Sequence, residues 1–209
     1  MHCRYALGAI ALLAGAAGLT AALAPQEKPK DAKPASAPAM DDDVMAKMAA
    51  MGTPGAEQKV LAAREGKWTY TMKWWMDPGA EPMESTGTSE SKMIMDGRYI
   101  VDEYKGTAMG MPFNGIGTSG FDNLKKKYVS TWIDNMSTAI MFMEGTYDAA
   151  TKTFTWKGEG PDPVAGKYMP MRMVDKMIDA NKGTTEFYST DAKSGKEFKS
   201  GEIAYTRAK

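Results

Sequence analysis

From Gly66 to the end of the chain, apolar and polar residues alternate, and short turn sequences interrupt the alternation at regular intervals. Alternation with a period of two indicates strands that bury one face. The interruptions include Asp77-Pro78-Gly79, Asp96-Gly97 and Asn181-Lys182-Gly183, which favour tight connections between antiparallel neighbours. The pattern predicts ten strands, near residues 68–76, 84–95, 98–107, 113–121, 127–134, 138–146, 153–158, 168–174, 184–190 and 197–206.

These strands follow one another without a long helix between them. Meandering strands of this kind can cover their edges by curling shut. We therefore predict a mainly β fold, an antiparallel up-and-down barrel of about ten strands, with a two-sheet sandwich as the alternative. Three connections begin with Asp122, Asp148 or Asp191, and we expect each carboxylate to bond the backbone of its own turn.

One or two short helices are predicted before the first strand. Three aspartates open a segment, residues 41–52, in which apolar residues recur at helical spacing. A second helix is predicted with Thr53 as its N-cap, Val60 and Leu61 on its buried face, and Gly66 after its C-terminus.

The first 24 residues contain one basic residue, Arg4, followed by an uncharged run rich in Ala, Leu and Gly. This pattern is typical of a secretory signal peptide, and cleavage after Ala22 would send the rest of the chain to the periplasm or the medium. The alternative is an uncleaved membrane anchor, because the run is about long enough to span a bilayer. Residues 25–40, rich in Pro, Ala and Lys, are predicted to be a flexible linker, and residues 41–209 a single barrel domain.

The amino-acid composition limits the catalytic and metal-binding chemistry that the exported chain can carry out. The only histidine and the only cysteine are His2 and Cys3, ahead of the predicted cleavage. The exported chain would then lack a Ser/His/Asp relay, a cysteine nucleophile, a disulfide and an ordinary zinc site. Basic and acidic residues balance, 26 against 26, so the basic excess of nucleic-acid-binding domains is missing. We expect no cofactor, no nucleic-acid partner, membrane contact only through an uncleaved N-terminus, and no enzyme activity.

A series of short motifs between residues 53 and 207 resembles a bacterial family known as domain of unknown function 1579. The resemblance implies an exported protein with a lipocalin-like fold and no established activity. Related sequences often carry histidine where this chain has Gln58, so an imidazole-dependent role in relatives would be lost here. The motifs that carry the resemblance are Gly97-Arg98-Tyr99, Gly110-Met111-Pro112-Phe113-Asn114-Gly115, Gly120-Phe121-Asp122, Trp132-Ile133-Asp134 and Gly145-Thr146-Tyr147-Asp148, with Thr53-Pro54-Gly55 before them and Asp162-Pro163 after.

A barrel interior lined by methionine and aromatic side chains is an adaptable apolar pocket. Our leading hypothesis is therefore a protein that binds a small apolar or amphipathic ligand inside the barrel. On the strand from Tyr128, alternate residues give one mixed aromatic and polar face, and Arg98 shares a face with Tyr104 on its own strand. An inward Arg98 would bind an anionic ligand group, and the alternative is a structural ion pair with an acid at the barrel rim. The candidate ligand-binding residues are Arg98, Tyr104, Tyr128, Trp132, Asp134, Met141 and Met143.

Methionine is unusually common, with 19 in the chain, and many lie two residues apart. Such neighbours share one face of a strand, where they either fill an irregular core or present paired thioethers to a soft metal such as Cu(I). This metal binder is the alternative to the ligand-binding barrel. A third hypothesis is a hydrolase that pairs Asp134 with Glu144, since these acids lie on strands predicted to form a hairpin. The spaced methionines are Met93 and Met95, Met109 and Met111, Met141 and Met143, and Met169, Met171 and Met173.

Overall fold

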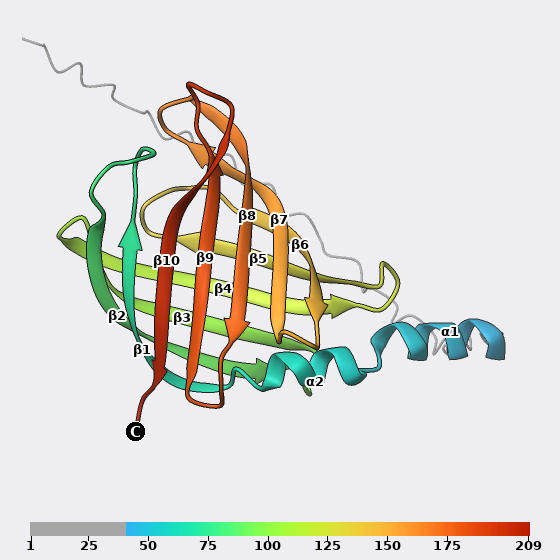
Figure 1. Ribbon diagram of the computed structural model, residues 1–209. Helices are drawn as coiled ribbons and strands as arrows, with labels where there is room; N and C mark the ends of the chain where they lie inside the picture. The colour runs from blue at the N-terminus through green and yellow to red at the C-terminus, as the bar shows by residue number, and fades with distance from the viewer. Residues whose placement is uncertain (1–40) are drawn as a thin grey trace, which may run out of the picture. The chain divides into compact units, whose positions relative to one another are not determined.

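The computed structural model describes residues 41–209, so the predicted signal and linker lie outside the described residues. Two helices precede ten strands (Figure 1). The helices are α1 (Asp42–Gly52) and α2 (Ala56–Ala62). The strands are β1 (Gly66–Trp74), β2 (Met83–Ile94), β3 (Tyr99–Ala108), β4 (Met111–Asp122), β5 (Lys127–Asp134), β6 (Met141–Asp148), β7 (Thr153–Asp162), β8 (Lys167–Met177), β9 (Lys182–Thr190) and β10 (Glu197–Arg207).

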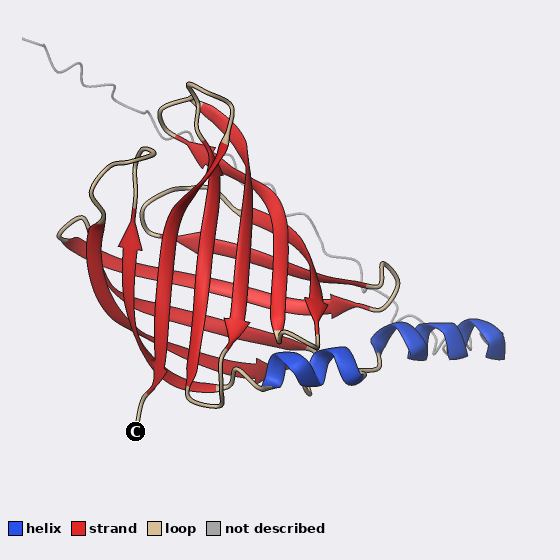
Figure 2. Ribbon diagram, in the orientation of Figure 1, coloured by secondary structure: helices blue, strands red, loops and turns tan. Residues whose placement is uncertain are grey.

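The strands form one closed barrel in which each pairs antiparallel with its neighbour in the chain (Figure 2). β1 and β10 close the wall, with Trp68 opposite Arg207 and Trp74 opposite Gly201. The prediction of about ten strands in an up-and-down barrel is confirmed, and the sandwich alternative is wrong. Closure is favourable because it leaves no strand with an unpaired edge.

The aspartates that open the hairpins bond their own turns, as expected. Asp122 Oδ1 accepts from the backbone N–H of Leu124 at 2.8 Å and of Lys125 at 2.9 Å. Lys126 then takes the left-handed conformation, with φ 55°, which redirects the chain into β5. These hydrogen bonds to the backbone lower the pKa of Asp122. The turn is therefore specified by local sequence, independently of the rest of the barrel.

The helices start and end slightly differently from the prediction. Gly55, not Thr53, caps α2, and its N–H donates to Gln58 Oε1 at 2.7 Å. The Thr53 hydroxyl instead donates to the carbonyl of Ala49 at the end of α1. Gln58 is buried and its Nε2 donates to the carbonyl of Phe121 in β4, so it anchors α2 to the barrel. Neither described helix is long and apolar enough to cross a membrane.

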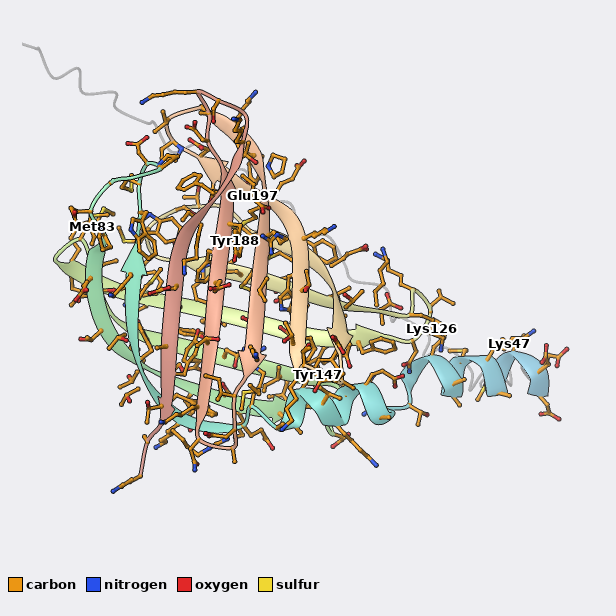
Figure 3. The ribbon with its side chains drawn as sticks, viewed as in Figure 1. Lys47, Met83, Lys126, Tyr147, Tyr188 and Glu197 are labelled. Carbon is orange, nitrogen blue, oxygen red and sulfur yellow. The ribbon has the colours of Figure 1, made fainter. Side chains whose placement is uncertain are left out.

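The two ends of the barrel are packed differently. α2 covers one end, where Leu61, Ile100 and Trp156 are fully buried in a core with further aromatic side chains. At the other end, inward-facing side chains are only half-buried, among them Trp74 and Phe113. Figure 3 places Tyr147 beside α2 and Met83 far from it. The interior is therefore packed more tightly at the helix end than at the opposite end, which we call the open end.

Candidate functional site

The interior contains a polar cluster centred on Arg64, which follows α2 in the chain. Its guanidinium reaches Asp102 of β3 at 3.3 Å and lies 3.8 Å from Asp175 of β8. The Ser91 hydroxyl donates to the other oxygen of Asp102. Asp102 is 4 % exposed and the Arg64 side chain 19 %, so these charges lie inside the wall. One basic group is thus shared by two acids.

Asp175 accepts hydrogen bonds from two side chains, one on each strand next to β8. Trp156 Nε1 of β7 donates to Oδ2 at 2.8 Å, and Thr185 Oγ1 of β9 donates to Oδ1 at 2.6 Å. Burial acts to lower the pKa of Arg64, but the charges of Asp102 and Asp175 outweigh it, and the pKa is raised. The guanidinium therefore stays charged at any physiological pH, because its pKa is far above neutrality even when unperturbed.

A cavity of about 40 Å³ adjoins this cluster. A single water needs roughly 10–15 Å³ measured in the same way, so the cavity has room for a few waters or one small polar group. Arg64, Asp175, Ser89, Tyr104 and Tyr205 are among the residues that line it.

Two tyrosine hydroxyls meet beside the cavity. The hydroxyls of Tyr104 and Tyr205 are 3.0 Å apart, and the ring of Tyr104 lies edge-on to Trp132 with centroids 5.3 Å apart. Burial raises the pKa of both tyrosines. Burial also raises the pKa of Tyr128 to about 12.

We expect the interior tyrosines to ionise later than free tyrosine. The neutral form is favoured in the folded state, so this contribution to stability is present below pH 10 and is lost as pH rises through the raised pKa values. An absorbance titration at 295 nm should show fewer tyrosinates at pH 11 in the folded chain than in about 6 M guanidinium, where every tyrosine titrates near pH 10. Tyr128→Phe should remove one late-ionising group. Superimposable curves in the two solvents would contradict the expectation.

The structure brings some of the predicted site residues together. Four of them face the interior, and the rings of Tyr104 and Trp132 pack edge to face; the four are Tyr104, Trp132, Met141 and Met143. Tyr128 also points inward, but it belongs to the helix end, where its hydroxyl donates to the carbonyl of Glu57 in α2 at 3.1 Å.

The other two candidate residues each pair with a side chain close to them in sequence. Arg98 follows the β2–β3 turn, and its side chain is 40 % exposed and lies 3.6 Å from Asp96, so it forms the ion pair that was the alternative to a role in ligand binding. The positive φ values of Met95 and Asp96 place the residues before β3 in the turn, which removes Arg98 from the alternation of the strand. Asp134 lies at the open end and accepts from Trp132 Nε1 at 2.7 Å, so it positions that indole.

The hypothesis of a hydrolase that pairs Asp134 with Glu144 is wrong, because the two side chains lie on opposite faces of the barrel wall. Asp134 is on the inward face of β5, whereas Glu144 is on the outer face of β6, where Lys125 and Lys127 donate to it at 3.1 and 2.6 Å. These hydrogen bonds lower the pKa of Glu144. The two carboxylates therefore cannot flank one substrate.

The methionines that lie two residues apart in the sequence fall into two groups, one that includes turn residues and one on inward strand faces. Met95 and Met109 have φ of 51° and 52° in turns, so neither shares a strand face with Met93 or Met111. The methionines of β6 and β8 do face inward as predicted, at Met141, Met143, Met169, Met171 and Met173. Among residues 41–209, no group of three or more His, Cys, Asp or Glu side chains is arranged to hold a metal ion.

Sequence reasoning missed Arg64 and Asp175. Arg64 lies in the connection after α2, where the pattern indicates an exposed residue, and nothing local shows that its side chain enters the barrel. Asp175 stands at an inward position among Met171 and Met173, and an acid on an otherwise apolar strand face was the signal that could have identified it.

The family assignment agrees with this architecture. Residues 53–207 match the family described as Protein of unknown function (DUF1579). The chain belongs to this family. No curated protein is detectably similar to it in sequence.

Two solved structures are similar to this DUF1579 protein in fold. The crystal structure of Rv2717c from M. tuberculosis has a TM-score of 0.57 at 12% identity, covering 75% of this chain and 100% of that one. The S-type phycobiliprotein lyase CPES from Guillardia theta has a TM-score of 0.51 at 8% identity, covering 75% and 99%. At such identities the likeness concerns the fold alone, a lipocalin-like barrel.

Proposed function

We propose that this protein binds a small amphipathic molecule inside its barrel without chemically changing it. The observation that supports this most directly is the unequal packing of the interior. At the helix end the inward-facing side chains Ile100, Phe154 and Trp156 are at most 2 % exposed, whereas Trp132 and Met141 near the open end are half-buried. On this proposal the ligand enters from the open end, and the tightly packed helix end forms the floor of the site.

The polar cluster favours a particular kind of head group. Asp102 and Asp175 place two carboxylates beside the single guanidinium of Arg64. Acidic groups therefore outnumber basic groups in the cluster, two to one. A ligand hydroxyl or ammonium group would supply further donors in the adjoining cavity, whereas a ligand carboxylate would be repelled by the two acids. We infer that the ligand carries a neutral or cationic donor.

The apolar part of the ligand would lie between this cluster and the open end. Phe113 stacks near Trp132 with centroids 6.3 Å apart, and Trp74 lies near Phe187 at 6.1 Å. Met141, on β6, also belongs to this lining. Its side chain has three rotatable bonds and can move to admit the alkyl chain of the ligand.

We propose as well that the chain is exported. The support comes from residues 1–24, whose basic start and apolar run are those of a secretory signal, and from the lack of a thiol or imidazole in the rest of the chain. Secretion from cells that express the full chain, followed by N-terminal sequencing of the released protein, tests this directly.

Three probes with the same twelve-carbon tail test the ligand proposal: dodecylamine, dodecanol and dodecanoate, titrated by calorimetry below their micellar concentrations. We expect the amine and the alcohol to bind at least about tenfold more tightly than the acid, a difference of about 1.4 kcal/mol. Quenching or enhancement of tryptophan fluorescence should accompany binding, since Trp132 lines the interior. The absence of binding by all three probes would refute the proposal.

A matched pair of variants on one strand locates the site. Ser89 lines the cavity from the inner face of β2, whereas its neighbour Thr88 is exposed on the outer face. Ser89→Val should fill the cavity and weaken dodecylamine binding at least about tenfold, while Thr88→Val should leave it unchanged. Equal affinities for the two variants would show that the probe binds elsewhere.

A further inference from the structure

Inward methionines from two different strands face each other across a gap in the lining. β6 contributes Met141 and β8 contributes Met169 and Met171. The strand between them is β7, and its inward positions at this level are Gly158 and Gly160, which have no side chains. Gly158 pairs with Met171, and Gly160 pairs with Met169.

The space over Gly160 shows how close the sulfurs are. A Cβ atom placed on Gly160 would lie 2.9 Å from Met171 Sδ and 3.2 Å from Met141 Sδ. The two sulfurs therefore lie within about 6 Å of each other, the sum of those distances. Two thioethers from strands that are not hydrogen-bonded to each other thus converge on one point of the interior.

We propose that Met141 and Met171, with Met169 next to them on the inward face of β8, form a binding site for a soft monovalent cation, Cu(I). Neutral thioether sulfur is a ligand that selects Cu(I) over hard cations. Small rotations about the side-chain bonds of Met141 and Met171 would bring the sulfurs to coordination distance, and the glycines of β7 leave the room for this movement. All three methionines are half-buried, so an ion can reach them from the open end.

The cation site is argued from sulfur atoms on β6 and β8, whereas the head group of the proposed amphipathic ligand is argued from Arg64, Asp102 and Asp175. Met141 belongs to both sites, as a cation ligand and as part of the lining around the apolar tail. Dodecylamine binding without metal and cation binding without dodecylamine are separate measurements, and either can fail alone.

Silver(I) is a redox-stable probe for this site. The titration should use the full chain carrying His2→Asn and Cys3→Ser, which removes its only imidazole and thiol. We expect native mass spectrometry to show one tightly bound Ag(I) per chain. Met141→Leu together with Met171→Leu, which nearly conserves side-chain volume, should weaken binding at least about tenfold.

The matched control replaces two exposed methionines in strands, Met83→Leu together with Met111→Leu, and should bind Ag(I) like the parent. Equal loss of Ag(I) affinity in both double variants, or no loss in the interior one, would overturn the proposal.

Methyl NMR of the parent chain, labelled at its methionine methyl groups, gives a second measurement that does not require any variant to fold. Ag(I) should shift the Met141 and Met171 methyl signals first, and shifts confined to exposed methionines would equally exclude the site.

Discussion

Arg64→Met is expected to lower the free energy of unfolding by about 3–5 kcal/mol, since removal of one partner leaves a buried charge uncompensated. Asp102, 4 % exposed, would lose its only cationic partner among the described residues, and Asp175 would lose the same guanidinium. Urea unfolding followed by circular dichroism measures the change. The unbranched methionine side chain is about as long as the aliphatic part of arginine, so the packing of that part is kept while the charge is lost.

The outer face offers a matched control. Arg172 of β8 donates to Glu197 at 2.7 Å, but these side chains are 27% and 51% exposed. Figure 3 shows Glu197 and Tyr188 close to each other on this face. Arg172→Met should lower the free energy of unfolding by about 1 kcal/mol or less, because water screens an exposed ion pair.

Adding Asp102→Asn and Asp175→Asn to Arg64→Met should recover part of the free energy of unfolding that Arg64→Met removes. A cost below about 1 kcal/mol for Arg64→Met would show that the interior acids do not need the arginine.

Leu61→Ala is expected to destabilise the barrel by about 2–5 kcal/mol, because it leaves a cavity at the helix end. Leu61 is fully buried and belongs to the same core as Ile100 and Trp156. Together with Gln58 it holds α2 over the barrel end, so its loss weakens the floor of the proposed ligand site. Urea unfolding gives the free energy.

The control for Leu61→Ala comes from the other helix. α1 has no buried residue, and Val44 is 43% exposed on it. Val44→Ala, another apolar-to-alanine change in a helix, should alter stability by less than about 0.5 kcal/mol. Similar effects of the two substitutions would mean that α2 is not a structural part of the barrel.

Much of the fold could be predicted because its determinants are local. Alternation fixed the ten strands to within a few residues, and Asp122 and the other turn aspartates bonded their own turns as expected. The error at Thr53 has a physical cause: its hydroxyl bonds backward to Ala49 in α1, which leaves Gly55 to cap α2. Arg98 pairs with Asp96 at the rim and does not line the interior, because Met95 and Asp96 have positive φ and the turn extends up to β3.

The site was predicted less well because its members meet only after closure. Tyr104 and Trp132 were identified from their strand faces, but Arg64 was missed, since it comes from a connection and enters the barrel beside strands distant in sequence. Met141 was predicted to line the interior and Met171 to share a strand face with Met169 and Met173. Their approach to each other depends on Gly158 and Gly160 of β7, and no local pattern indicates it.

By itself the sequence determined the number of strands, their antiparallel order and most of the side chains that face inward, because period-two patterning and turn chemistry act over a few residues. Only the tertiary structure decided which inward residues meet. Closing a barrel tilts and staggers its strands, so the neighbours across the interior depend on the whole ring and not on any one strand. The Arg64 cluster and the methionines around Gly160 are both products of that closure.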